Sequence, residues 1–266
     1  YAYIEEAFGP FAGFIASMLF WFGWSALSDA AITVAMVGAL ALAFPILAEP
    51  VPRSIFIITL LSFLAAVNVI GVKAGVRLFV FNTIAKLIPL VLLLAFGIFA
   101  IKFENLAIME WPSISTVGGS AIILFFAFAG AESGLSASGE IKNPSKTVPL
   151  GLLLGLTGIL ALYVGLQTVS QGVLGAELAN NMDAPLAAVA TEVFGEWGAK
   201  MLLVGGVISI YATVSGDMLS APRVVFASAR DNNLPKFLTA VHPKYKTPYV
   251  SIIFFAAVVC VFALSG

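Results

Sequence analysis

The sequence AIILFFAFAGAESGLSASGEIKNPSKTVP, residues 121–149, decides how the rest of the chain is interpreted. It begins as an apolar helix over residues 122–128 and then enters residues 129–134, where two glycines and small residues surround Glu132. Each glycine destabilises a helix interior by roughly 1 kcal/mol relative to alanine. An ionisable group near the bilayer centre costs about 2.5–3.5 kcal/mol on insertion scales. The stretch therefore predicts a membrane helix that is broken at about residues 129–134.

A helix that breaks inside a bilayer exposes backbone N–H and C=O groups, which need protein or water as partners. Many secondary transporters bind zwitterions at such breaks, because half-helix N-termini attract a carboxylate and unwound carbonyls attract an ammonium. The alternative is a glycine-rich packing face in which Glu132 is hydrogen-bonded to a neighbouring helix. The combination of glycines with a carboxylate favours the binding site.

The composition is that of an integral membrane protein. Hydrophobic residues make up 61% of the 266 residues and charged residues 10%, whereas a soluble domain has about 25% charged residues. The formal net charge of −1 argues against nucleic acid as a partner. The sequence has no metal-ligand cluster, nucleophile–base pair or phosphate-binding glycine loop, so we expect no metal, no cofactor and no enzymatic activity.

Apolar runs predict seven membrane spans, and the expected fold is an all-α polytopic membrane helix bundle in one domain, residues 1–266. A tight turn at residues 71–77 is expected to join the second span to the third. Residues 183–194 have apolar positions at helical spacing, which predicts an amphipathic helix on a membrane face. The spans are expected at residues 8–44, 54–70, 78–101, 122–134 with the break, 148–173, 201–225 and 250–263.

Lysine and arginine residues predict which side of the membrane each loop occupies. Successive loops lie on alternate sides of the membrane, and the loops of one side hold only Arg53, Lys102 and Lys200. The loops of the other side hold more cations, so we expect that side to be cytoplasmic, with the N-terminus of the chain on that side of the plasma (inner) membrane. The loops of the cation-rich side hold Lys73, Arg77, Lys142, Lys146, Arg223, Arg230, Lys236, Lys244 and Lys246.

Several polar residues fall inside the predicted spans. Charged groups at this depth pair or line an aqueous path, so Lys86, Asp29 and Glu132 are candidate functional residues, whereas hydroxyl stripes also serve as glue between helices. We expect Lys86 to be the proton-coupling group with Asp29 as its partner, and Glu132 and Asp217 are rival partners. Helical spacing places polar residues on one face of each of two spans. They are Ser25, Ser28, Asp29 and Thr33 in the first span and Ser209, Thr213, Asp217 and Ser220 in the sixth.

Several motifs together resemble the amino acid–polyamine–organocation superfamily of permeases along nearly the whole chain. They are Tyr1-Ala2-Tyr3 with Phe8-Gly9-Pro10, Asn82-Thr83-Ile84-Ala85-Lys86-Leu87, residues 125–132, Glu140-Ile141-Lys142-Asn143-Pro144, Val148-Pro149, residues 223–235, His242-Pro243-Lys244-Tyr245 and Thr247-Pro248.

The resemblance implies a fold of ten core helices in two inverted five-helix repeats, with the first and sixth helices broken. By this comparison the chain corresponds to helices three to nine, and the first two core helices and the C-terminal helices are expected outside it. Lys86 matches a lysine that occupies a sodium position in proton-coupled members, which makes protons the expected coupling ion.

The resemblance also implies the residues of the substrate site. Carbonyl groups at the break would bind the α-ammonium of an amino acid, and an aromatic residue would act as a gate. The implied residues are Ala129, Gly130 and Glu132 at the break, Phe126 as the gate, Gly23, Trp24 and Ser28 against the substrate side chain, and Ser215 on the facing wall.

The leading hypothesis is a proton-coupled amino-acid permease, whose partners are an amino acid, protons and the lipid bilayer. A second hypothesis is an exchanger of cationic amino acids or polyamines, which Asp29 and Glu132 would suit electrostatically. A third, from another class, is a seven-helix photoreceptor in which Lys86 forms a retinal Schiff base and Asp29 is its counter-ion.

Overall fold

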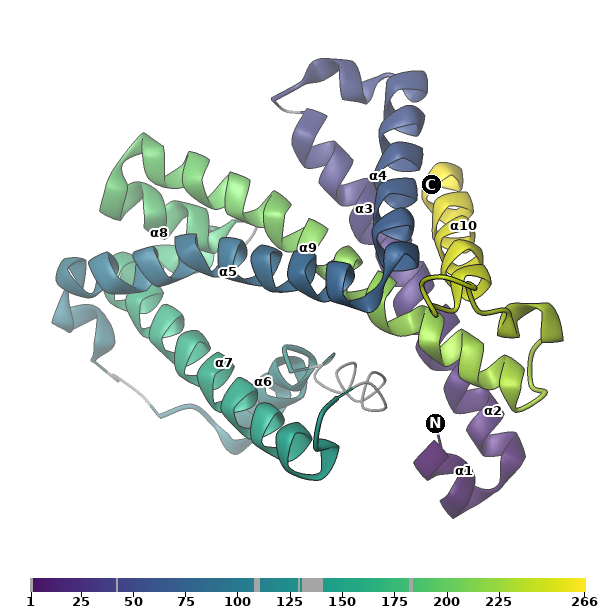
Figure 1. The fold of residues 1–266 in the computed structure, drawn as a ribbon. Coiled ribbons are helices and arrows are strands. Elements are labelled where there is room, and N and C mark those ends of the chain that lie inside the picture. The colour runs from purple at the N-terminus through teal and green to yellow at the C-terminus, as the bar shows by residue number, and fades with distance from the viewer. Residues whose placement is uncertain (1, 42, 108–110, 129, 131–140, 182–183) are drawn as a thin grey trace. The chain divides into compact units, whose positions relative to one another are not determined.

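The computed structural model describes residues 2–41, 43–107, 111–128, 130, 141–181 and 184–266. These residues are mainly helical, and no β-strand occurs among them. The α-helices, shown in Figure 1, are α1 (Ala2–Phe8), α2 (Pro10–Met18), α3 (Leu27–Ala41), α4 (Pro50–Ile70), α5 (Val72–Gly97), α6 (Ile114–Phe126), α7 (Pro144–Leu174), α8 (Pro185–Phe194), α9 (Glu196–Arg230) and α10 (Tyr249–Ser265).

The chain forms two compact units. The first comprises Tyr1–Ile84 and Val207–Gly266, the second comprises the residues between them, and the boundaries fall within α5 and α9. Short 3-10 helices lie at Pro45–Ala48, Ile98–Ala100, Phe103–Leu106, Gly175–Asn181 and Lys236–Thr239.

Five helical stretches of the described residues are long and apolar enough to cross a membrane. Helices α6 and α10 are also apolar, but they have 13 and 17 residues, fewer than the ~20 that a complete crossing needs. The predicted all-α polytopic membrane fold is confirmed, and five of the seven predicted spans have the necessary length. The five stretches are Pro10–Ala41, Pro50–Ile70, Lys73–Ala100, Pro144–Asn181 and Glu196–Arg230.

The first span contains a segment that the sequence did not predict. Leu19–Ala26 (η1) is a π-helix that joins α2 to α3 without a break. Beyond it, Asp29 and Thr33 are buried, as is Ser25 within it, but Ser28 is exposed. The prediction that Ser28 shares their face is wrong, because the π-helix that contains Ser25 encloses more residues per turn than the α-helix on which the spacing was based.

The core of the first unit joins α3, α4, α9 and α10. Figure 1 shows α4 beside α10, and these two helices are in contact. Large side chains such as Ile57, Leu64 and Phe255 are completely buried in this cluster. Small residues, including Ala30 and Ala221, lie in the same cluster and allow helix backbones to approach closely.

The turn predicted at residues 71–77 is wrong. Gly71 alone separates α4 from α5, with a φ of 151°, and α5 begins at the next residue. Lys73 and Arg77 therefore lie in the first turns of α5, both exposed. Lysine and arginine tolerate this position because their long side chains reach toward water. In the same way Lys200, Arg223 and Arg230, assigned to loops, lie within α9.

A buried hydrogen bond ties the segment before α10 to the end of α4. Thr247 is 1% exposed, and its hydroxyl donates to the carbonyl oxygen of Val69 over 2.8 Å. Val69 lies in the last turn of α4, where carbonyl groups lack partners within the helix. The threonine therefore satisfies a helix-end carbonyl.

We expect Thr247→Val to destabilise the full-length protein by about 0.5–1.5 kcal/mol, because a half-buried acceptor loses its donor while the side-chain shape is kept. Thermal unfolding in detergent micelles measures the effect. Thr247→Ser retains the hydroxyl and serves as the control. Equal melting temperatures for the valine variant and wild type would show that the bond adds no stability.

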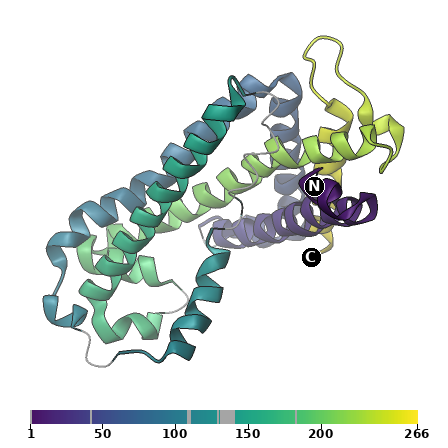
Figure 2. The same ribbon diagram turned by 90° about the horizontal axis from the view of Figure 1, so that it is seen from below.

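The second unit packs α7 and α8 around a smaller core. Buried residues of this core include Leu166, Val169, Val189 and Ala190, and α8 contacts α7 (Figure 2). The amphipathic helix predicted at residues 183–194 is confirmed from Pro185 onward, and Asp183 lies outside the described residues. Its buried face carries Val189 and Ala190, while Glu192 on the opposite face is exposed.

Candidate functional site

Helix α6 leads into residues 129–134, where the sequence predicts that the membrane helix is broken. The Ser113 hydroxyl caps the N-terminus of α6 by accepting from the backbone N–H of Thr116 over 3.1 Å, so α6 begins at Ile114 and not at the predicted residue 122. It ends at Phe126, two residues earlier than predicted, because Ala127 and Phe128 form a turn.

The described part of the predicted break is not helical. Ala127 and Phe128 donate backbone hydrogen bonds three residues back, to Leu124 and Phe125, which closes the last turn of α6. Gly130 follows with a φ of 101°, a conformation that glycine adopts without a steric penalty. Of the other predicted break residues, Ala129 and Glu132 lie outside the described residues. Phe126 is described as the last helical residue only.

Tyr163 on α7 contacts the end of α6 and was missed by the sequence analysis. Its hydroxyl donates to the carbonyl oxygen of Ala127 over 3.4 Å. Its ring packs edge-on against Phe128, with ring centroids 6.0 Å apart. A tyrosine within the predicted span 148–173 was the available signal, since a phenol hydroxyl at membrane depth needs a hydrogen-bond partner.

The carbonyl end of a helix can bind a cation. The last carbonyls of a helix carry a partial negative charge, because they lack intrahelical partners and because the peptide dipoles are aligned. The end of α6 at Phe126 therefore presents its negative end to the break at Ala127 and Gly130. This arrangement suits an ammonium group.

The first unit holds five of the predicted site residues. Gly23 and Trp24 lie in the π-helix and Ser28 at the start of α3, with Gly23 and Ser28 exposed and Trp24 half-buried. Ser215 on α9 is buried. Asp29 is completely buried and interacts with Asp217 of α9. The structure thus brings Asp29 together with one of the two rival partners named for Lys86.

Lys86 belongs to the second unit. It lies half-buried near the middle of α5. Its ammonium group makes no ion pair with a described residue of its own unit. The pairing of Lys86 with Asp29, which belongs to the first unit, stays a prediction.

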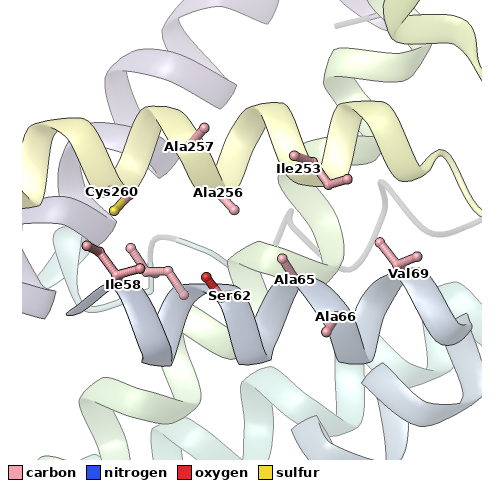
Figure 3. Close-up of a pocket in the computed structure, with 10 residues that line it drawn as sticks. Ile58, Ser62, Ala65, Ala66, Val69, Ile253, Ala256, Ala257 and Cys260 are labelled. Atoms are coloured by element: carbon pink, nitrogen blue, oxygen red, sulfur yellow. The ribbon is translucent and has the colours of Figure 1, made fainter. Parts of the chain in front are cut away.

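A pocket of about 450 Å³ lies between α4 and α10. Figure 3 shows side chains of the two helices on opposite sides of it, among them Ile58 and Ala65 on α4 and Ile253 on α10. Ser62 and Cys260 are the polar side chains among an otherwise apolar lining. The lining has no charged group for a carboxylate or an ammonium, so this pocket does not suit a zwitterion. Within the described ranges no three His, Cys, Asp or Glu side chains are grouped to hold a metal ion.

Known proteins match this chain over most of its length. A family model described as "Amino acid permease" matches residues 1–265. The chain is 32% identical over 275 residues to the serine/threonine exchanger SteT of Bacillus subtilis (strain 168), a match that covers 99% of this chain and 61% of SteT.

Two further relatives are similar over a shorter part. Identity to the branched-chain amino acid permease BcaP of B. subtilis (strain 168) is 31% over 186 residues, which is 70% of this chain and 40% of BcaP. Identity to the cadaverine/lysine antiporter of Escherichia coli (strain K12) is 29% over 240 residues, which is 88% of this chain and 52% of the antiporter. The chain spans about half the length of these relatives.

Proposed function

Because this chain belongs to the amino acid permease family, we propose that the whole protein is a secondary transporter that moves amino acids across a membrane with protons as the coupling ion. The family and the five long apolar helices make it an integral membrane protein. The bacterial relatives support a location in the plasma (inner) membrane, and the distribution of lysine and arginine supports an orientation with the N-terminal end of this chain in the cytoplasm.

The C-terminal end of α6 is the structural feature that supports an amino acid as the substrate. An amino acid presents an ammonium group and a carboxylate to its transporter, and a helix C-terminus attracts the ammonium group. We assign the ammonium site to the backbone around Ala129 and Gly130, with Glu132 beside it and Phe126 as the gate. Tyr163 would hold the end of α6 in place through its bond to Ala127.

The side chain of the substrate is assigned to residues of the first unit. Gly23 and Ser28 have exposed surface and are small, so a ligand can approach the backbone closely at both positions. Trp24 offers an apolar surface, and Ser215 adds a hydroxyl on the facing wall. Lys86 is assigned to proton coupling, with Asp29 as the proposed partner.

Exchange of one substrate for another is a second candidate. Two of the relatives described above are named as an exchanger and an antiporter, which supports exchange over symport. The named substrates of these proteins include hydroxylated and cationic amino acids. The matches are to permeases and exchangers, which leaves the photoreceptor hypothesis for Lys86 without support.

Radiolabelled uptake into proteoliposomes tests the function of the full-length protein. We expect saturable uptake of at least one amino acid, faster with an inward proton gradient if the protein is a symporter and faster with unlabelled substrate inside if it is an exchanger. Uptake of no amino acid or polyamine above empty liposomes would contradict the proposal.

A pair of glycine variants tests the site at the end of α6. Gly130→Ala strains a backbone with positive φ and should reduce uptake about tenfold or more, since a strain of order 1–3 kcal/mol at the binding backbone opposes the bound geometry. Gly119→Ala on α6, where an added Cβ meets nothing within 4 Å, should retain wild-type uptake. Equal uptake by the two variants would contradict this location of the site.

A further inference from the structure

Asp29 is buried in an apolar part of the first unit. It has no exposed surface, and its near neighbours along the helix, Ala26 at the end of the π-helix and Ala30 on α3, belong to one apolar cluster with Val214 and Met218 of α9. No N–H or O–H donor of the described residues bonds to either carboxyl oxygen. A carboxylate in such a place needs a donor or a counter-charge.

The group that acts on Asp29 is another carboxyl. Asp217 of α9 lies close enough to interact with it electrostatically. A proton held by one of two neighbouring carboxyl groups lets that group donate a hydrogen bond to the other. Two carboxylates that share a site also repel each other, and such pairs retain a proton between them and titrate as a unit.

The charged environment of Asp29 is simple in the described part of the first unit. Among the described residues, Asp217 is the one titratable group with an electrostatic effect on it. The elements that pack against α3 carry the following titratable or charged side chains in this unit, apart from Asp217: Arg53 on α4, Tyr211, Arg223 and Arg230 on α9, and Tyr249 and Cys260 on α10.

Buried hydroxyl groups lie near Asp29 along the first span, one in the π-helix and one on α3. Ser25 and Thr33, one helical turn to either side, are completely buried. Their oxygen atoms have no hydrogen-bond partner among the described residues, and the same holds for Ser220, close after Asp217 on α9. Unpartnered buried hydroxyls are rare in folded proteins. Each of these hydroxyls can accept or donate, so they suit a site whose proton is gained and lost.

We propose that Asp29 and Asp217 form a proton-binding pair, which holds one proton between the two carboxyl groups within the first unit. A hard metal cation would require about six or more oxygen ligands, whereas two carboxyl oxygens are sufficient for a proton. The pair shares Asp29 with the Lys86 site assigned above and joins it to a carboxyl of its own unit. Its use in coupling rests on the proposed transport function, but proton binding by the pair does not.

Infrared difference spectroscopy of the full-length protein in lipid tests the pair directly, because a protonated carboxyl has its own C=O band. We expect the wild-type protein to show this band at neutral pH. Asp29→Asn and Asp217→Asn should each lose it, because the remaining carboxylate then accepts from the new amide N–H. Wild-type-minus-variant spectra separate the pair from other carboxyl groups, including Glu132.

The control is Glu192→Gln, which changes an exposed carboxyl on α8 and should leave the band intact. A band that persists in both aspartate variants would overturn the proposal. A band lost in Asp29→Asn but kept in Asp217→Asn would show a single protonated Asp29 and also overturn the pair. Loss of the wild-type band on adding Na⁺ at constant pH would indicate a cation site instead.

The test does not depend on every variant being stable. If Asp29→Asn does not yield folded protein by size-exclusion chromatography, the Asp217→Asn spectrum and a pH titration of the wild-type band still decide between a shared proton and none. The readout is independent of transport, so a failure of the uptake experiment and a failure of this proposal are distinguishable.

Discussion

Replacing Lys86 with alanine in the full-length protein is expected to abolish proton-driven accumulation of substrate while sparing substrate binding. Lys86 lies half-buried on α5 and has no ion-pair partner among the described residues of its own unit. An ammonium group in this setting is unstable by about 2.5–3.5 kcal/mol on insertion scales. Proton binding at Lys86 is therefore sensitive to whether a carboxylate is near, which is the property that coupling requires.

Proteoliposomes with an imposed pH gradient measure this effect. A gradient of one pH unit supplies about 1.4 kcal/mol per proton, which corresponds to a tenfold accumulation ratio. We expect the Lys86→Ala variant to reach a ratio of about one, while equilibrium binding of the substrate persists. Lys73→Ala, an exposed lysine on the same helix, is the matched control and should accumulate substrate as the wild type does. Concentrative uptake by the Lys86 variant would contradict the mechanism.

Substituting Gly198 with alanine is expected to produce the largest loss of stability in the second unit. Gly195, with a φ of 68°, joins α8 directly to α9, and Gly198 lies in the first turn of α9. A Cβ at Gly198 would collide with the main-chain carbonyl of Ala190 on α8. Backbone cannot rotate away as a side chain can, so the corner between the two helices must open.

The expected destabilisation is about 1–3 kcal/mol, the usual range for overpacking a well-packed site. Helix propensity alone would predict the opposite sign, since alanine is more favourable than glycine in a helix by about 0.5–1 kcal/mol. Gly206→Ala on the same helix is the control, because a Cβ there meets nothing within 4 Å. Thermal unfolding in detergent should show a melting temperature below that of the wild type for Gly198→Ala and above it for Gly206→Ala. If both variants shift the melting temperature in the same direction, the α8–α9 corner is not closely packed.

Apolar run length and glycine position predicted much of the fold, because a bilayer demands long apolar helices with internal hydrogen bonds. The errors arose where local composition opposed the structure. Residues 71–77 contain two cations and two glycines, which suggested a turn, yet only Gly71 leaves the helix. Residues 115–121 are mostly small or polar, and the helix was predicted only from residue 122, yet the Ser113 cap starts α6 at Ile114.

The site was less predictable, because its contacts depend on packing between distant segments. Asp29 and Asp217 were each recognised as intramembrane carboxylates, but their meeting depends on how α3 packs against α9. Helical spacing describes one helix at a time and carries no information about such a contact. The bond from Tyr163 to Ala127 was missed for the same reason, since it joins α7 to the end of α6.

The π-helix of the first span sets the angular phase between the two halves of that span. An α-helix advances by roughly 100° per residue, and each π-turn encloses one residue more than an α-turn. The half before it places Ser17 against Ser228 of α9, with oxygens 2.5 Å apart, and the half after it places Asp29 against Asp217 of the same helix. Removing one residue from Leu19–Ala26 would rotate one half against the other by roughly 100°. The two contacts could then no longer form together, so the length of this segment is constrained by geometry even where its side chains face lipid.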